Sequence, residues 1–252
     1  MMKSMAILGL VAGVLLGRAL AAGEVAVLSA GAVEPGLKAA AAAFERQTRH
    51  VVKISFNTVP QIRTRIVGGE RADVVIATPA VLDEFAKAGK IEKERAAIGR
   101  IGMGVAVRTG AAAPDIASGD AFKRSMLAVD TLVFSRGSSG VYFEGLLKKM
   151  GISDQIQAKV TRYDDGAAVF EHLLKGKGND VAVGQITEIR LYRDKGLRLV
   201  GPLPADVQNF TSYAAAPMTA MSNAEGARDF VRYLGTPAAK ALFAAAGIEQ
   251  SQ

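Results

Sequence analysis

The chain has 252 residues, half of them hydrophobic, a formal net charge of +7 and no cysteine. This length suits one large domain or two lobes, and the lack of cysteine excludes disulfides, thiol catalysis and thiolate metal sites. No run of lysine and arginine with interleaved aromatic residues appears, so we expect no nucleic-acid partner and a surface charge that mildly favours anionic ligands.

The N-terminus has the order of a secretory signal peptide. A positive start at Met1–Lys3 precedes an apolar run from Met5 to Leu16, and Ala19–Ala21 offers a cleavage site of the A-x-A type. The apolar run is shorter than the roughly 20 residues that a membrane span requires. The sequence therefore predicts that residues 1–21 are a signal peptide and that the mature protein is periplasmic.

A strand followed by a helix is the repeated unit of the first part of the chain. Val25–Leu28 predicts a buried strand, Ser29–Ala32 a loop of small residues, and the alanine-rich segment up to Phe44 a helix with Pro35 in its first turn. The same order recurs twice, with strands expected at 51–56 and 72–77 and helices at 61–67 and 81–88. This rhythm favours a parallel sheet wrapped by helices.

The second part of the chain continues the α/β pattern. Ser222 or Asn223 is the expected cap of a helix that starts at Ala224. The last expected strand contains Pro217, which we place at a sheet edge because proline cannot donate a ladder hydrogen bond. The expected strands are 102–108, 131–134, 159–163, 180–184 and 212–220, and the expected helices are 141–150, 166–175, 224–234 and 237–246.

Small residues follow several strands, at the sheet edge where ligands of parallel sheets collect. The strand ends 29–32, 57–59 and 77–78 each lead into a helix, whose first N–H groups form a positive end. Arg136–Gly140 resembles a backbone nest with the hydroxyls of Ser138 and Ser139. Each feature alone is also typical of an ordinary turn or helix cap. Together they predict an anion site, for which Arg63 could supply a guanidinium.

Catalytic patterns are absent from the sequence. His50 and His172 lack ligand-type neighbours, and we expect both to be packing or surface residues. Asp164 and Asp165 are expected to precede or cap a helix. No motif of a zinc protease, a serine hydrolase or a nucleotide-binding loop occurs. We therefore expect a protein without catalytic residues, bound metal or cofactor.

Several short segments, taken in order, carry a resemblance to a known family. They are Val25–Glu45, Ile54–Phe56 with Ile62–Gly69, Ala72–Val74, Gly140–Tyr142, Asp180–Gly184, and the tail Ala227–Leu234 through Phe243–Ile248. The set resembles the periplasmic molybdate-binding proteins of ABC importers, within the type 2 periplasmic binding proteins, and indicates a divergent member. The resemblance implies an α/β fold of two lobes, each a mainly parallel sheet flanked by helices, joined by two crossing strands. The lobes would be 24–101 with 214–252, and 102–213.

The resemblance also implies a set of ligand-binding residues, some of which depart from the family pattern. In the family, hydroxyl groups of the first two loops bind the oxyanion, but Ala32 and Val59 occupy those positions here. The family's later tyrosine falls near Thr187. The ligand is then either a molybdate-like oxyanion or a small organic carboxylate, such as a di- or tricarboxylic acid. The predicted ligand-binding residues are Ser29, Ala30, Gly31, Ala32, Asn57, Thr58, Val59, Arg63, Thr78, Ser138, Ser139, Gly140, Tyr142, Gln185 and Thr187.

The sequence thus predicts a monomeric solute-binding protein that captures a small anion between its lobes. It would deliver this ligand to an ABC permease without performing chemistry. One alternative is a secreted hydrolase using Ser138 or Asp165, which requires a base beside Ser138. Another is a sensor or scaffold that has no ligand in its cleft.

Overall fold

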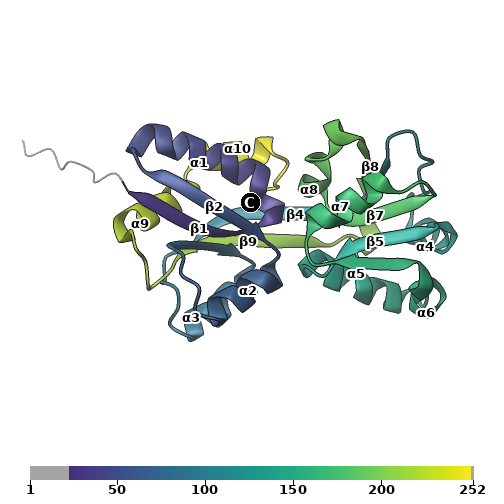
Figure 1. The fold of residues 1–252 in the computed structure, drawn as a ribbon, viewed down its shortest axis with the longest axis horizontal. Coiled ribbons are helices and arrows are strands. Elements are labelled where there is room, and N and C mark those ends of the chain that lie inside the picture. The colour runs from purple at the N-terminus through teal and green to yellow at the C-terminus, as the bar shows by residue number, and fades with distance from the viewer. Residues whose placement is uncertain (1–22, 251–252) are drawn as a thin grey trace, which may run out of the picture.

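Two long strands connect the lobes of the protein. The computed structural model describes residues 23–250, and in it β4 (Ala96–Arg108) and β9 (Phe210–Pro217) cross between the lobes as an antiparallel pair (Figure 1). The first half of β4 pairs with β9, and its second half pairs with β7 (Asp180–Gln185) and β8 (Leu197–Pro202). The expected crossing strands are therefore confirmed.

The first lobe contains a mainly parallel sheet in the order β2-β1-β3-β9-β4. Strands β1, β2 and β3 are parallel, and β9 is antiparallel to β3. Helices α1 and α10 lie on one side of this sheet, and α2 and α3 on the other (Figure 1). The elements are β1 (Glu24–Ala30), a 3-10 turn (Gly31–Val33), α1 (Glu34–Thr48), β2 (Val51–Asn57), α2 (Val59–Val67), β3 (Val74–Ala77), α3 (Pro79–Lys87), α9 (Ala224–Leu234) and α10 (Pro237–Ala245).

The second lobe repeats this arrangement in the order β4-β7-β5-β6, with β8 on the other side of β4. Strand β5 is parallel to both β6 and β7, and β7 is antiparallel to β4. The elements are α4 (Gly119–Ala128), β5 (Thr131–Ser135), α5 (Ser138–Lys149), α6 (Ser153–Ile156), β6 (Val160–Tyr163), α7 (Gly166–Lys175), α8 (Ile186–Arg190), and 3-10 turns at Gln157–Lys159, Arg193–Lys195 and Ala205–Val207.

Each lobe buries apolar residues of its own. The largest cluster draws on residues 25–101 and 213–248, with Phe44 and Phe230 packed at a ring-centroid distance of 5.0 Å. A second cluster lies in the other lobe around Phe134 and Phe143, whose rings meet edge to face at 5.0 Å. Separate cores are what independent lobes require. We therefore propose that the lobes divide the chain as predicted, into 24–101 with 214–252, and 102–213.

The structure differs from the predicted elements in several places. Helices α4, α6 and α8 and strand β8 are not predicted; β8 is held in place by its pairing with the distant β4, whereas α4 has a local cap signal in Ser118, which accepts from the N–H of Ala121. Strand β4 begins at Ala96, since residues 96–101 pair with β9. Pro217 is not at a sheet edge, because β9 lies between β3 and β4. It is the last residue of β9, where its missing N–H does not interrupt the ladder of hydrogen bonds. Ser138–Gly140 form the first turn of α5 and not a loop.

No helix within residues 23–250 is long and apolar enough to cross a membrane. The predicted signal peptide, residues 1–21, lies outside this range.

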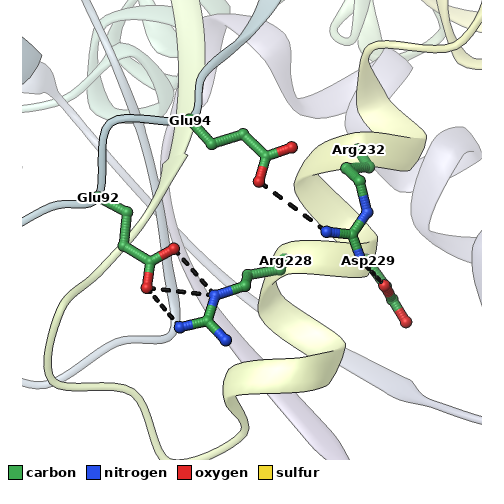
Figure 2. Close-up of polar contacts among 5 residues, drawn as sticks. All are labelled: Glu92, Glu94, Arg228, Asp229 and Arg232. Atoms are coloured by element: carbon green, nitrogen blue, oxygen red, sulfur yellow. Dashed lines mark hydrogen bonds and ion pairs between the residues drawn. The ribbon is translucent and has the colours of Figure 1, made fainter.

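An ion-pair cluster attaches α9 to the segment that precedes β4 (Figure 2). The guanidinium of Arg228 donates to both carboxylate oxygens of Glu92, with Nη2 at 2.6 Å from Oε1 and Nε at 3.0 Å from Oε2. Arg232 contacts Asp229 and lies 4.0 Å from Glu94. The hydrogen bond from Arg228 is the main cause that lowers the pKa of Glu92. The cluster therefore stabilises the charged form of Glu92.

Glu92→Gln should lower the free energy of unfolding at pH 7, by less than about 1 kcal/mol because the pair is exposed. The pKa of Glu92 is lower in the folded protein than in the unfolded chain, so this stabilisation is present above the unfolded pKa and is lost as the pH falls through the folded one. Urea unfolding of both proteins at pH 7 and pH 3 measures the effect. A difference of equal size at both values would show that the ion pair is not its cause.

Candidate functional site

A cavity of about 220 Å³ lies between the two lobes. Its walls are the carboxyl ends of β1, β2, β5 and β7 and the turns and helices that follow them, together with Tyr213 from the crossing strand β9. This is the sheet edge at which ligands of parallel sheets collect. The first lobe contributes Ala30, Gly31, Ala32, Glu34, Phe56, Asn57, Thr58, Val59 and Gln61, and the second contributes Ser135, Gly137, Ser138, Ser139, Asp165, Gly166, Ala167, Gln185 and Glu188.

Helices α1, α2, α5 and α7 all begin at this cavity. Thr58, Gly137 and Asp165 directly precede α2, α5 and α7, and α1 continues from the 3-10 turn Gly31–Val33. The first N–H groups of a helix have no partner inside the helix and carry a partial positive charge. Both lobes therefore turn amide donors toward one space, an arrangement that favours an anion.

The lobes touch each other around these helix beginnings. A Cβ atom built at Gly137 would lie 3.3 Å from Thr58 Cγ2, across the boundary between the lobes. Thr187 Oγ1 donates to the carbonyl oxygen of Ala32 at 2.6 Å, and both residues are buried. Because Ala32 lies in the first lobe and Thr187 in the second, this hydrogen bond links the two lobes.

Most of the predicted ligand-binding residues line the cavity. Ser138 and Ser139 present the first turn of α5, and the side chains of Ala32 and Val59 are buried and apolar, so only the backbone of these two can bind a polar group. The lining residues from the predicted set are Ala30, Gly31, Ala32, Asn57, Thr58, Val59, Ser138, Ser139 and Gln185. Their contact with a ligand stays a prediction.

Three other predicted residues lie outside the lining, and their hydroxyl groups have partners within the protein. Ser29, Tyr142 and Thr187 each donate to a backbone carbonyl oxygen, at 3.2, 3.1 and 2.6 Å. Ser29 is a fully buried strand residue, and Tyr142 packs against the core of the second lobe. The structure thus gives these side chains a structural role.

Arg63, Thr78 and Gly140 also lie outside the lining. Arg63 is more than half exposed on α2 and pairs with Glu84 at 2.6 Å, so its guanidinium is held at the surface. Thr78 directly precedes α3, a helix that packs on β9. Gly140 lies so close to the preceding strand that a Cβ atom there would be 1.7 Å from the carbonyl oxygen of Ser135. Its role is the close approach of α5 to β5.

Glu188, on α8, is a cavity residue that the sequence does not predict. Its carboxyl group lies between the lobes, since Cβ atoms built at Gly31 and Gly166 would be 3.1 and 2.8 Å from Oε1. Burial is the main cause that raises the pKa of Glu188, to about 7, and the negative charges of Glu34 and Asp165 add to it. A carboxyl group with this pKa exchanges its proton near neutral pH.

The two other acids of the cavity have partners that Glu188 lacks. Asp165 caps α7, as predicted, with Oδ1 accepting from the backbone N–H of Ala168 at 2.8 Å. Glu34 pairs with Lys38 at 2.5 Å. No such hydrogen bond or ion pair to Glu188 occurs within residues 23–250, and the cavity lining contains no lysine or arginine.

Two further polar groups face the same space. Tyr213 is 4% exposed, and burial, aided by the charge of Glu188, raises the pKa of its phenol, which therefore stays protonated and can donate a hydrogen bond. Gln185 donates through Nε2 to Thr211 Oγ1 at 3.0 Å. Its buried Oε1 has no partner among the residues that the structure describes. A donor group of a ligand is one partner that could satisfy this oxygen.

Both histidines are packing residues, as predicted, and neither lines the cavity. His50 stacks on Phe44 with ring centroids 5.9 Å apart, and His172 Nδ1 lies 2.8 Å from the Tyr163 hydroxyl. A hydrolase that used Ser138 would therefore have no imidazole base among the lining residues. No cluster of metal-binding side chains occurs in the described part of the chain.

Two α/β lobes joined by crossing strands, with helix beginnings around an interlobe cavity, define the fold of type 2 periplasmic binding proteins. The chain belongs to the bacterial extracellular solute-binding protein family, whose profile covers residues 25–249.

The chain is also similar to one protein named as an enzyme and to solved structures of anion-binding proteins. The chain is 30% identical over 224 residues to an aconitate isomerase of Pseudomonas sp., a match that covers 86% of this chain and 84% of that protein. Its fold is similar to the periplasmic molybdate-binding protein of Azotobacter vinelandii, with a TM-score of 0.74 and 17% identity over 92% of this chain and 100% of that chain. It is also similar to a sulfate-binding protein of Mycobacterium tuberculosis, with a TM-score of 0.71 and 18% identity over 90% of this chain and 86% of that chain. The predicted resemblance to molybdate-binding proteins is confirmed for the fold.

Proposed function

We propose that this protein binds a small di- or tricarboxylate in the cavity between its lobes. The observation that carries the proposal is that α1, α2, α5 and α7 begin at one cavity, so that amide donors of both lobes surround an anion. The name of the Pseudomonas relative adds support, because aconitate is a tricarboxylate. We place the protein outside the cytoplasm, as a monomer that passes its ligand to an ABC permease.

The composition of the wall favours an organic acid over an inorganic oxyanion. Phe56, Ala32, Val59 and Ala167 provide apolar surface beside the amides and hydroxyls. A carbon skeleton makes van der Waals contacts with such a surface, whereas molybdate or sulfate has only oxygen atoms to offer. Amide and hydroxyl donors can hold the carboxylates without a lysine or arginine, because they are dipoles fixed in a region of low dielectric constant.

A thermal-shift and calorimetric panel tests this function. We expect trans-aconitate, cis-aconitate, citrate or tricarballylate to bind, and a ligand at a hundredfold its Kd should add about 2.7 kcal/mol to the free energy of unfolding. Molybdate, tungstate and sulfate should have no effect. Stabilisation by molybdate alone would assign the site to an oxyanion, and no binding by any member would favour the ligand-free sensor or scaffold.

Ser138→Ala should weaken the binding of that ligand about tenfold to a hundredfold, because a hydrogen bond to a charged group contributes about 1.5–3 kcal/mol. Thr64→Ala is the matched control, since its hydroxyl donates to Pro60 O on the exposed face of α2. Titration calorimetry of both variants gives the two Kd values. If Ser138→Ala and the wild type bind the ligand with equal affinity, the first turn of α5 does not bind it through Ser138.

A second candidate function is an isomerase that acts on the bound polycarboxylate. Two observations favour it: the name of the Pseudomonas relative, and an ionisable carboxyl group, Glu188, that lines the ligand cavity. Conversion of one aconitate isomer into the other, followed by ultraviolet absorption, distinguishes the isomerase from a protein that only binds.

A further inference from the structure

We propose that Glu188 is a catalytic residue that removes a proton from a carbon atom of the bound polycarboxylate and returns it to another carbon of the same molecule. This inference rests on the proposed function, because it requires a polycarboxylate in the cavity. It adds a reaction step and names the group that performs it.

The position of Glu188 is the first argument. Its carboxyl group lines the same cavity as the helix beginnings, so a ligand held by those amides lies beside it. Gly31 and Gly166 leave room for this group, because a methyl at either position would come within 3.1 or 2.8 Å of Oε1. The carboxyl is thus placed between the two lobes and faces the ligand space, with no other described partner to occupy it.

The surroundings of Glu188 are the second argument. Glu34, Asp165, Tyr192 and Tyr213 face it from α1, the cap of α7, the segment after α8, and β9, and Lys195 lies nearby over the Tyr192 ring. Burial, with the negative charges of Glu34 and Asp165, favours the neutral form, which makes the charged form a stronger base than an exposed glutamate. With a pKa of about 7, Glu188 can both accept a proton and return it at neutral pH.

The reaction balances without an oxidant or a cofactor. In an unsaturated tricarboxylate such as aconitate, the methylene C–H lies next to a double bond and to a carboxylate. Glu188 takes this proton, and the electron pair spreads over three carbons onto carboxylate oxygens, where helix amides stabilise the added charge. The protonated Glu188 then donates to the far carbon. The double bond moves by one position, and the formula of the ligand is unchanged.

Proton NMR in D₂O tests the step on the full protein, with trans-aconitate as substrate and tricarballylate, which has no double bond, as the binding-only probe. The wild type should form the cis isomer, and any deuterium in the product reports exchange of the Glu188 proton with solvent before its return. Glu188→Gln should lower kcat by about a hundredfold or more and should bind tricarballylate at least as tightly as the wild type. The wild-type rate should rise as the pH increases through the pKa of the base.

Two further variants separate the role of the carboxyl group from a general loss of structure. Gly166→Ala keeps Glu188 but crowds its carboxyl, so kcat should fall while tricarballylate binding persists. Glu84→Gln, whose carboxylate pairs with Arg63 at the surface, should retain the wild-type rate. Binding of both probes without conversion of trans-aconitate in the wild type, or full activity of Glu188→Gln, would overturn the assignment alone. Absence of any polycarboxylate binding would overturn the proposed function and this inference with it.

Discussion

Glu188→Gln is expected to stabilise the ligand-free protein at pH 8 by up to about 3 kcal/mol relative to the wild type. The pKa of Glu188 rises from 4.5 to about 7 on folding, and each unit corresponds to about 1.4 kcal/mol. The folded protein holds the proton more tightly than the unfolded chain, so the wild type loses stability as the pH rises from about 4.5 through about 7. Glutamine is neutral and shows no such loss.

Urea unfolding of the two proteins at pH 4 and pH 8 measures this effect. The difference in unfolding free energy should be small at pH 4 and largest at pH 8. Glu92→Gln is the control of opposite sign, because it removes a carboxylate whose pKa is lowered by folding and should destabilise at high pH. A Glu188→Gln variant that is less stable than the wild type at pH 8 would mean that an unseen partner stabilises the charged carboxylate.

Asp73→Ala is expected to lower the free energy of unfolding by about 3–5 kcal/mol, since it leaves buried donors without a partner. Asp73 is 2% exposed. Its Oδ2 accepts from the N–H of Ala26 at 2.8 Å, and its Oδ1 accepts from the N–H groups of Ser222 and Asn223 at 2.6 and 3.1 Å. One carboxylate thus ties β1 to the segment that leads into α9.

Asp73→Asn is the matched variant for this prediction. It keeps the size of the side chain and one acceptor oxygen, so the loss should be smaller than with alanine. Denaturant unfolding gives both values, and hydrogen exchange of the Ser222 and Asn223 amides should speed up in both proteins. A loss below about 1 kcal/mol in Asp73→Ala would show that water replaces the carboxylate.

The predicted stability cost of Glu188 agrees with a functional role for this residue. Glu188 is partly buried, and groups whose pKa is shifted by burial and neighbouring charge collect at functional sites. In a protein that only binds anions, a neutral glutamine at position 188 would repel the ligand less. Binding and catalysis therefore make opposite demands on this position, and the variants above separate them.

The strand-and-helix order of this protein could be predicted from local pattern, and so could the loops that line the cavity. The apolar runs at Val25–Leu28 and Ala72–Ala77, the proline at the first turn of α1, and the small residues after β1 and before α5 each act within a few residues of chain. Arg63 shows the limit of that reasoning. Its place on an amphipathic helix is local, but its distance from the cavity depends on how α2 packs.

The sequence by itself determined the α/β class, the helix beginnings that follow the strands, and the absence of a cysteine-based catalyst, because these depend on residue types and short spacings. Only the tertiary structure decided that Glu188 faces the ligand space, that Tyr213 joins it from a crossing strand, and that Thr187 instead bonds the opposite lobe. These facts depend on contacts between residues more than a hundred positions apart in the chain, such as Thr187 with Ala32 at a separation of 155. The charges beside Glu188 come from α1 of the first lobe and from the cap of α7 in its own lobe, so no local pattern encodes its pKa.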